Sequence, residues 1–258
     1  MNSLDILGVR VDDVTYAEAL ALLQQYIATR EPHYVVTPNP EFVMAARRDP
    51  AFRAALAGAA LAVPDGGGLL LAARLWGRPF REQVRGTDLV YRLAAAGART
   101  RQRWFLLGAG PGVAAAAGQR LMARYPGLQV VGTYAGSPSP AADAATCAAV
   151  RAAQPLDVLL VAYGAPRQEL WMARNVAALG VPVAIGIGGV LDYVAGRVRR
   201  APRWVRDLGA EWLYRLVTQP WRWRRQLALP CFAALALWES PRRRTVLRRR
   251  CEAFLDPR

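Results

Sequence analysis

Short apolar runs alternate with amphipathic segments along most of the chain, and this alternation predicts strands and helices in turn. Runs rich in Val, Leu, Ile and Ala are typical of strands that are buried on both faces of a sheet. We expect strands at residues 6–11, 33–37, 59–63, 104–107, 129–134, 157–162 and 183–187. Because helical stretches separate these runs, the pattern predicts an α/β fold in which helices cover both faces of a mostly parallel sheet.

Local signals indicate where several of the helices begin. Thr15 and Glu18 have the spacing of a capping box. Asn39 and Asp49 each precede a proline, which is typical of an N-cap followed by the first helical residue. We expect Thr87 to cap the helix that follows it.

A carboxylate among glycines follows the predicted strand at 59–63. Asp65 lies between Pro64 and the glycines of 66–68, which permit positive φ and the close approach of a ligand. One interpretation is a tight turn in which Asp65 caps the helix at 69–76. The other is a catalytic base in a ligand-binding loop.

The place of Asp65 at a strand end favours the catalytic interpretation. In open parallel sheets, ligands bind outside the carboxyl ends of the strands. Other residues expected at that edge are Thr37, Asn39, Gly108, Tyr134, Gly164, Gln168 and Gly188.

The glycine-rich segment from Gly108 through Gly110 to Gly112 also follows a strand and precedes a helix. A dinucleotide-binding fingerprint would require glycine where Val113 stands, and no acidic residue follows Tyr134 to bind a ribose. We therefore expect no nicotinamide cofactor. The segment either holds a nucleotide phosphate or lets its helix pack closely against the sheet.

The net charge of +15 comes from arginine, because the chain contains no lysine. Residues 197–258 hold 16 arginines against 5 acidic residues, a net charge of +11. Such a segment suits a nucleic acid, an anionic membrane surface or a phosphorylated substrate. This change of composition divides the chain into an α/β core at 1–196 and a basic helical appendage at 197–258.

The appendage combines tryptophans and arginines with a short apolar stretch. Residues 221–225 alternate Trp and Arg, and residues 227–238 are apolar but too few to span a bilayer. This combination favours a helix that lies on a membrane surface. An ordinary buried helix is the alternative, and a nucleic-acid partner is not expected because no recognition module is present.

Metal, disulfide and relay chemistry are not indicated. Cys147, Cys231 and Cys251 are too scattered for a disulfide framework or a zinc site, and the first residues do not resemble a signal peptide, so we expect a cytoplasmic protein. The sequence has neither an Asp-x-Asp pair nor a cluster with metal-ligand spacing, so arginines would have to neutralise any substrate phosphates. We expect a structural role for His33, the single histidine.

Six motifs, spread in order over nearly the whole chain, resemble the WecG/TagA/CpsF glycosyltransferase family. They are Thr37-Pro-Asn-Pro-Glu41, Pro64-Asp-Gly66, Arg85-Gly-Thr-Asp88, Gly164-Ala-Pro-Arg-Gln-Glu169, Gly188-Gly189 with Asp192 and Ala195-Gly-Arg-Val198, and Glu211-Trp-Leu-Tyr-Arg215. The chain departs from the family pattern at Gly67, Gly68 and Val190-Leu191. These departures bear on the choice of sugar more than on the type of reaction.

The resemblance implies a Rossmann-like core and an appendage that completes the active site at the cytoplasmic membrane face. It implies inverting transfer of a hexose, often an N-acetylmannosamine-type sugar, from a UDP-sugar to a polyprenyl-diphosphate-linked sugar. Asp65 would be the general base, and no cofactor is implied. The pocket residues would be Thr37, Asn39, Arg85 and Gln168, and the diphosphate-binding residues would be Arg215, Arg222 and Arg225.

Another class of function fits the same residues. A non-catalytic protein that binds a nucleotide sugar or a lipid phosphate would keep the arginines and the glycine loops, but would not need Asp65. A second copy of the chain also stays open as a partner.

Overall fold

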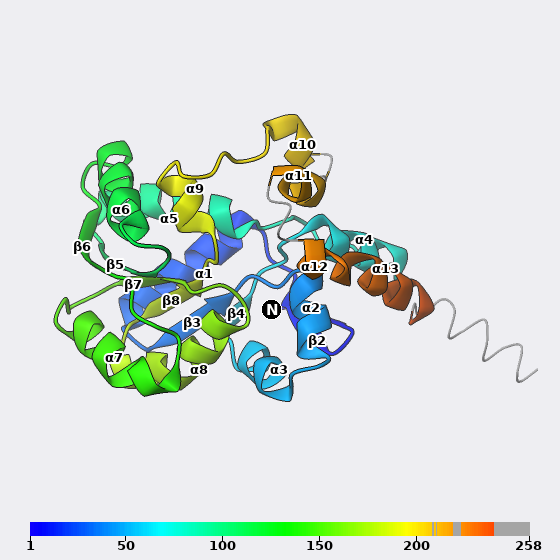
Figure 1. Cartoon of the computed structure of the whole chain (residues 1–258), viewed down its shortest axis with the longest axis horizontal. Coiled ribbons are helices and arrows are strands. Elements are labelled where there is room, and N and C mark those ends of the chain that lie inside the picture. Colours follow the sequence, from blue (N-terminus) through cyan, green and yellow to red (C-terminus); the bar gives the residue numbers. More distant parts are fainter. Residues whose placement is uncertain (208, 210, 219–222, 240–258) are drawn as a thin grey trace, which may run out of the picture.

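The fold is an α/β sandwich with a group of short helices at one side (Figure 1). The computed structural model describes residues 1–207, 209, 211–218 and 223–239. Six parallel strands form the sheet in the order β4-β3-β8-β7-β5-β6, which confirms the predicted fold class. Their bounds are β3 His33–Val36, β4 Leu61–Ala62, β5 Arg103–Gly108, β6 Gln129–Tyr134, β7 Val158–Ala162 and β8 Val183–Gly186.

The first predicted strand, residues 6–11, is wrong. Strands β1 (Ser3–Ile6) and β2 (Val9–Asp12) instead form an antiparallel hairpin in which Ile6 pairs with Val9. Leu7 and Gly8 occupy the turn with φ of 55° and 88°. A two-residue turn of this kind needs positive φ at both positions, and leucine seldom supplies it, so the apolar pattern concealed the turn.

Two hydrophobic clusters fill the two faces of the sheet. On one face lie helices α1 (Tyr16–Thr29), α5 (Gly86–Arg99), α6 (Val113–Arg124) and α9 (Val190–Val194). On the other lie α2 (Pro40–Ala46), α3 (Pro50–Ala57), α4 (Gly67–Leu75), α7 (Asp143–Arg151) and α8 (Arg167–Leu179), and a short 3-10 helix, Pro140–Ala142, precedes α7. Strand residues alternate between the clusters: Leu160 faces the first, and Leu159 and Val161 face the second.

Most predicted helix starts are confirmed. Thr15 and Glu18 form the capping box of α1, and the side chains of Asn39 and Asp49 accept hydrogen bonds from the third residues of α2 and α3. The exception is Thr87, which lies inside α5. That helix begins one residue earlier, at Gly86, and has no side-chain cap.

Within the described residues, four further helices follow α9 and pack over the edge of the core. They are α10 (Arg203–Asp207), α11 (Glu211–Thr218), α12 (Trp223–Gln226) and α13 (Ala228–Trp238). Helix α13 packs against α2 and α4, and Phe232 and Ala236 join the hydrophobic cluster of that face. The indole Nε1 of Trp76, at the end of α4, donates to the carbonyl of Ala236 at 2.8 Å. The apolar stretch is therefore half buried rather than wholly at the surface.

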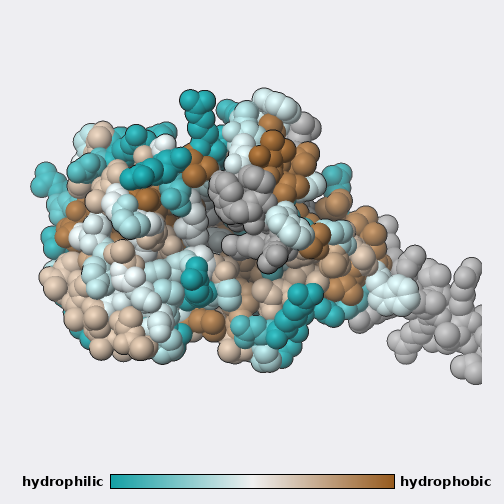
Figure 2. Space-filling view, viewed as in Figure 1, coloured by the Kyte–Doolittle hydropathy of each residue, from teal (hydrophilic) through white to brown (hydrophobic). Residues whose placement is uncertain are grey.

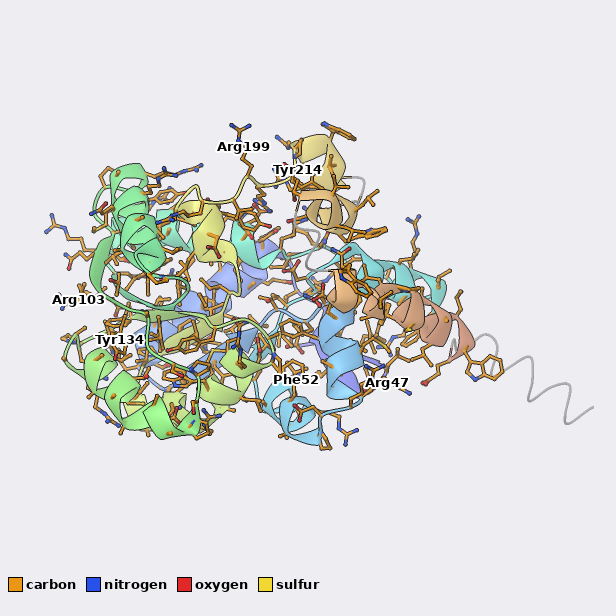
Figure 3. All side chains as sticks on the ribbon, in the orientation of Figure 1. Arg47, Phe52, Arg103, Tyr134, Arg199 and Tyr214 are labelled. Carbon is orange, nitrogen blue, oxygen red and sulfur yellow. The ribbon has the colours of Figure 1, made fainter. Side chains whose placement is uncertain are left out.

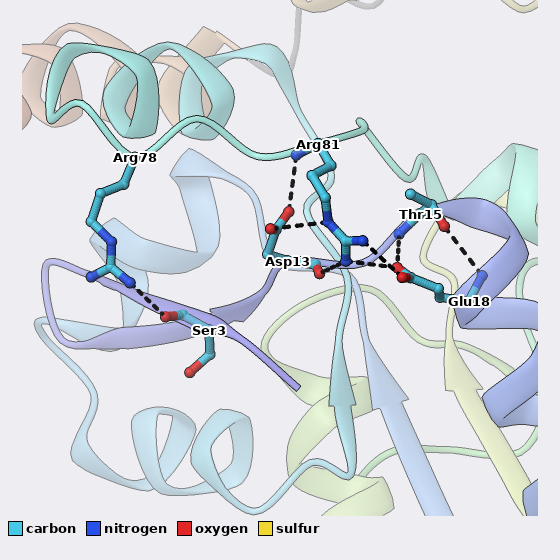
Figure 4. A network of polar contacts seen from close by, with 6 residues as sticks. All are labelled: Ser3, Asp13, Thr15, Glu18, Arg78 and Arg81. Atoms are coloured by element: carbon cyan, nitrogen blue, oxygen red, sulfur yellow. Dashed lines mark hydrogen bonds and ion pairs between the residues drawn. The ribbon is translucent and has the colours of Figure 1, made fainter.

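Arg81 fixes the segment between α4 and α5 to the start of α1 (Figure 4). Its guanidinium donates to the carboxylates of Asp13 and Glu18, and its amide also donates to Asp13. The hydrogen bond from Arg81 lowers the pKa of Glu18 to about 2. This network holds the residues that lead directly into Arg85.

Candidate active site

A cavity of about 220 Å³ lies at the carboxyl ends of β3, β4, β7 and β8. It brings together residues that are far apart in the sequence, as expected for an open parallel sheet. Its core residues include Thr37, Asn39, Asp65, Arg85, Gln168 and Gly188. The appendage closes another side with Arg200, Arg206, Glu211, Trp212, Gln226 and Leu229.

Asp65 is half-buried at the wall of this cavity. Its backbone amide donates to the carbonyl of Pro38 at 3.1 Å, and its Oδ2 accepts from the amide of Gly86 at 3.1 Å. Asp65 is not the cap of α4, since Gly66 occupies that position without a side-chain hydrogen bond. The carboxylate therefore bridges the β4 loop and the start of α5, which excludes the turn-capping interpretation.

The glycines after Asp65 permit close packing against the start of α2. Gly66 has φ of 92°, and a Cβ there would lie 3.3 Å from the side chains of both Asn39 and Pro40. A Cβ at Gly68 would lie 2.6 Å from Cγ of Pro40. Because only glycine fits at these positions, the loop can hold Asp65 beside Asn39.

Gln168 connects two loops at the floor of the site through hydrogen bonds. Its Oε1 accepts from the amides of Gly164, at 3.1 Å, and Gly188, at 2.9 Å, so it connects the loops after β7 and β8. Its Nε2 donates to Oε1 of the fully buried Glu169 at 2.7 Å. Thr37 donates its hydroxyl to the carbonyl of Gly186 at 3.4 Å, at the end of the neighbouring strand.

Arg85 links the core to the appendage. Its amide donates to the phenol oxygen of Tyr16 at 2.8 Å, and its guanidinium donates to the carbonyl of Arg206 at 2.8 Å. Burial raises the pKa of Tyr16 to about 12, so the phenol oxygen that accepts this bond carries no charge. Arg85 is thus held from both sides at the mouth of the cavity.

Asp88 forms ion pairs with two further arginines in the same part of the site. Arg200 donates to both carboxylate oxygens of Asp88, at 2.5 and 2.8 Å, and Arg206 lies 3.7 Å away. Burial acts to raise the pKa of Asp88, but the hydrogen bonds and charges of Arg200, Arg206 and Arg85 outweigh it and lower the pKa. Arg199, the neighbour of Arg200, points into solvent instead (Figure 3).

The sequence placed Asp88 in the motif at 85–88 and Arg200 and Arg206 among the arginines after Gly196, but it did not predict that these three side chains meet. Nε of Arg200 and of Arg206 is buried and has no hydrogen-bond partner among the described residues. An available signal was Asp88 itself, an acidic residue in the first turn of a helix in an arginine-rich chain.

The remaining predicted residues either lie away from the cavity or fall outside the part of the chain that the structure describes. Gly108 is the last residue of β5 and Gly110 follows it, but neither is among the residues that line the cavity. Gly108, with φ of 95°, fits closely against the backbone of Ala162, so close packing accounts for it. Arg222 is outside the described residues, and so are the side chains of Arg215 in α11 and Arg225 in α12.

The ring of His33 stacks on Tyr26 with 3.9 Å between centroids. This contact accounts for the histidine in structural terms. Within the described residues, no group of three or more His, Cys, Asp or Glu could hold a metal ion. No helix in the described part of the chain has the length and apolarity needed to cross a membrane.

Comparison with known proteins identifies the family. Residues 4–246 match the family described as the glycosyl transferase WecG/TagA/CpsF family. The chain belongs to this family. It is therefore a glycosyltransferase, which confirms the enzyme class expected from the six motifs.

Three curated relatives align with this chain over most of their length. The chain is 32% identical to a protein of Bacillus spizizenii over 212 residues, which cover 82% of this chain and 81% of the relative. It is 31% identical to a protein of Bacillus subtilis over 231 residues, covering 86% and 89%. It is 29% identical to a protein of Staphylococcus aureus over 230 residues, covering 88% and 89%. Each is named an N-acetylglucosaminyldiphosphoundecaprenol N-acetyl-beta-D-mannosaminyltransferase.

Proposed function

We propose that this glycosyltransferase moves an N-acetylmannosamine-type hexose from a UDP-sugar to a polyprenyl-diphosphate-linked N-acetylglucosamine. The names of the relatives support the acceptor and the sugar. The observation that carries the proposal is a half-buried carboxylate, Asp65, in a cavity that also contains Arg85, Arg200 and Arg206. The site thus combines a proton acceptor with positive charge.

The reaction we propose is a single displacement at the anomeric carbon. The acceptor hydroxyl forms the new C1–O bond as the bond from C1 to the UDP oxygen breaks, and the hydroxyl proton passes to Asp65. A positioned general base contributes about 10² to 10⁴-fold to such a step. The hydrogen bond from the Gly86 amide keeps the Asp65 carboxylate oriented before substrate arrives.

Arginines supply the counter-charge for the leaving UDP. Negative charge grows on the diphosphate as C1–O cleavage proceeds, and fixed cations stabilise it without reorganisation. Arg85 and Arg206 are connected by a hydrogen bond, and Asp88 holds Arg200 and Arg206. In this proposal Arg215, Arg222 and Arg225 bind the diphosphate of the acceptor.

The acceptor lipid places the reaction at a membrane, and we propose peripheral association at its cytoplasmic face. Figure 2 shows hydrophobic side chains gathered over α11 and along α13. The exposed apolar residues of these helices and of α12 are Trp212, Leu213, Val217, Trp223, Leu237 and Trp238. Tryptophans beside arginines are typical of a protein surface at the lipid headgroups.

A donor and acceptor panel tests the function. Purified full-length protein would be incubated with radiolabelled UDP-sugars and an N-acetylglucosaminyl diphosphate that carries a short isoprenoid chain. We expect transfer from UDP-N-acetylmannosamine, with β linkage in the product. Binding of UDP-sugar without transfer to any acceptor would instead support a non-catalytic binding protein.

A further inference from the structure

A second cavity of about 420 Å³ opens beside the candidate active site. We name it the α2/α13 groove, because α2 forms one wall and the region where α12 leads into α13 forms another. The α2 wall includes Phe42, Met44 and Ala45, and the opposite wall includes Leu227, Ala228 and Cys231. Ala165 and Pro166 form the floor at the start of α8. Apolar side chains thus make up most of the groove.

The groove shares part of its lining with the active-site cavity. Glu41, Phe42 and Ala165 line both spaces. Asn39, which lines the active-site cavity, and Glu41 belong to the same loop and helix start, so the groove begins within a few residues of that cavity. The two spaces are therefore adjacent, as the binding of one substrate in both would require.

The other end of the groove reaches the exposed apolar surface. Leu227 lines the groove and is 55% exposed, and Cys231 is exposed as well. Trp223 lies one helical turn before Leu227 and is also exposed. A hydrocarbon chain that leaves the groove at Leu227 would enter the surface that we propose to contact the membrane.

The acceptor has the matching chemistry. Its sugar and diphosphate are polar and charged, and suit the arginine-containing cavity, whereas the hydrocarbon next to the diphosphate is apolar. Removing apolar surface from water contributes about 25 cal/mol per Å². A groove of this size falls in the range of about 300–1,000 Å³ that is typical of ligand pockets.

We propose that the α2/α13 groove binds the first isoprene units of the polyprenyl-diphosphate acceptor. The proposal rests on the proposed function, since it assigns part of the same substrate. It predicts that the enzyme distinguishes acceptors by the hydrocarbon next to the diphosphate, in the absence of any membrane.

Acceptor chain length tests the proposal in detergent-free solution. We would compare kcat/KM for N-acetylglucosaminyl diphosphates that carry a methyl or a farnesyl group. We expect the farnesyl acceptor to be better by at least about tenfold in the wild-type enzyme, because its isoprene units bury apolar surface. In Cys231→Trp, which fills the groove from an exposed position, this ratio should fall to within about twofold of one. The matched control is Ala233→Trp, an exposed position on the same helix that does not line the groove, and it should keep the wild-type ratio.

A second measurement does not depend on turnover. Cys231 is exposed and Cys147 is buried, so in a Cys251→Ser background maleimide should label Cys231 first. We expect the farnesyl compound to slow this labelling by at least about fivefold, and the methyl compound to have little effect.

The outcomes distinguish a failure of the groove proposal from a failure of the proposed function. Transfer to both acceptors with equal kcat/KM, or equal ratios in Cys231→Trp and Ala233→Trp, would overturn the groove and leave the function standing. If no acceptor is used, the function fails, and labelling of Cys231 alone then decides whether the groove binds the isoprenoid. Protection of Cys231 that rises with protein concentration and needs no ligand would show that a second copy of the chain fills the groove, and would overturn the proposal.

Discussion

Asp65 is held by hydrogen bonds at both its backbone and its side chain, and the side chain lies at the cavity wall. The carbonyl of Pro38 holds its amide, the amide of Gly86 holds its carboxylate, and Gly66 allows the chain to turn away at once. A carboxylate in such a setting loses little freedom when substrate binds, which is what a general base requires.

Asp65→Asn should abolish transfer and leave UDP-sugar affinity within a few-fold. The amide keeps the shape of the carboxylate and can still accept from Gly86, but it cannot take the proton of the acceptor hydroxyl. We expect kcat to fall by about 10² to 10⁴-fold. Single-turnover transfer and calorimetric binding of UDP-sugar measure the two effects. Near-normal turnover would remove Asp65 from the role of base.

Gly68→Ala should destabilise the protein through overpacking. The new methyl group would lie 2.6 Å from Cγ of the buried Pro40, so α2 or α4 must shift. We expect a loss of about 1–3 kcal/mol in the free energy of unfolding, measured by urea denaturation. Gly110→Ala is the control, because its methyl group would meet only Cγ2 of Val113, at 3.6 Å. Equal effects of the two changes would contradict the packing argument.

At the scale of elements, apolar periodicity predicted the strands and most helices, because each buries an apolar face. It did not predict the β1–β2 hairpin, whose turn depends on positive φ at Leu7. It also left open whether residues 227–238 are buried or lie at the surface. One face of α13 is buried through Phe232 and Ala236, and the other is exposed through Leu237 and Trp238. A continuous apolar stretch carries no periodicity that separates two such faces.

The sequence predicts the site residues that lie at strand ends. It does not predict the contacts made by helices that are distant in the chain. Thr37, Asp65 and Gln168 follow strands, so a parallel sheet brings them together whatever the helices do. The cluster of Asp88 with Arg200 and Arg206 requires α10 to lie against the start of α5, and the place of Asp88 in the first turn of α5 does not by itself set that arrangement.

Asp88→Asn should loosen the contact between α10 and α5. The change leaves Arg200 and Arg206 close together without their carboxylate, and we expect a loss of about 1–3 kcal/mol in stability together with a lower kcat/KM. Asp143→Asn, which breaks the more exposed pair with Arg174, is the control and should cost about 1 kcal/mol or less.

The effect of Asp88 should depend on pH. The pKa of Asp88 is lowered in the folded protein, so its contribution is fully present above the unfolded value of about 4 and is lost as the pH falls below it. The stability difference between wild type and Asp88→Asn should therefore shrink below about pH 4. A difference that stays constant from pH 7 to pH 3 would show that the ion pair is not its source.

At the scale of the whole molecule, arginine provides all of the cationic side chains that could meet substrate phosphates or lipid. Guanidinium stays charged at every physiological pH and binds phosphate oxygens in pairs. The sequence contains no Asp-x-Asp pair that would bring a divalent cation to the diphosphate.

Transfer should accordingly continue in excess EDTA. We expect kcat in chelator to stay within about twofold of the untreated enzyme, because the arginines already supply the counter-charge to the diphosphate. A radiolabel transfer assay with and without added Mg²⁺ measures this. Loss of activity in EDTA and its recovery with Mg²⁺ or Mn²⁺ would contradict the assignment.

Binding to anionic vesicles should weaken as salt rises but should not vanish. The net charge of +11 in residues 197–258 contributes about 1 kcal/mol per arginine near the surface, and salt screens this over about 8–10 Å. The exposed tryptophans and leucines of α11 to α13 add an apolar part that salt does not remove. Co-sedimentation across a salt series separates the two parts, and neutral vesicles are the control. Binding that is independent of salt would contradict the electrostatic part.

The burial of Phe232 and Ala236 against α2 and α4 has a consequence for hybrid enzymes. Relatives could be recombined by joining the segment before Gly196 of one to the segment after it of another. Such a junction would separate α13 from α2 and α4, although all three helices pack in one hydrophobic cluster. Residues on α2, α4 and α13 must then change together in evolution. Hybrids that take α2, α4 and α13 from the same relative should fold. Hybrids that take α13 from one relative and α2 and α4 from another should have mismatched packing surfaces.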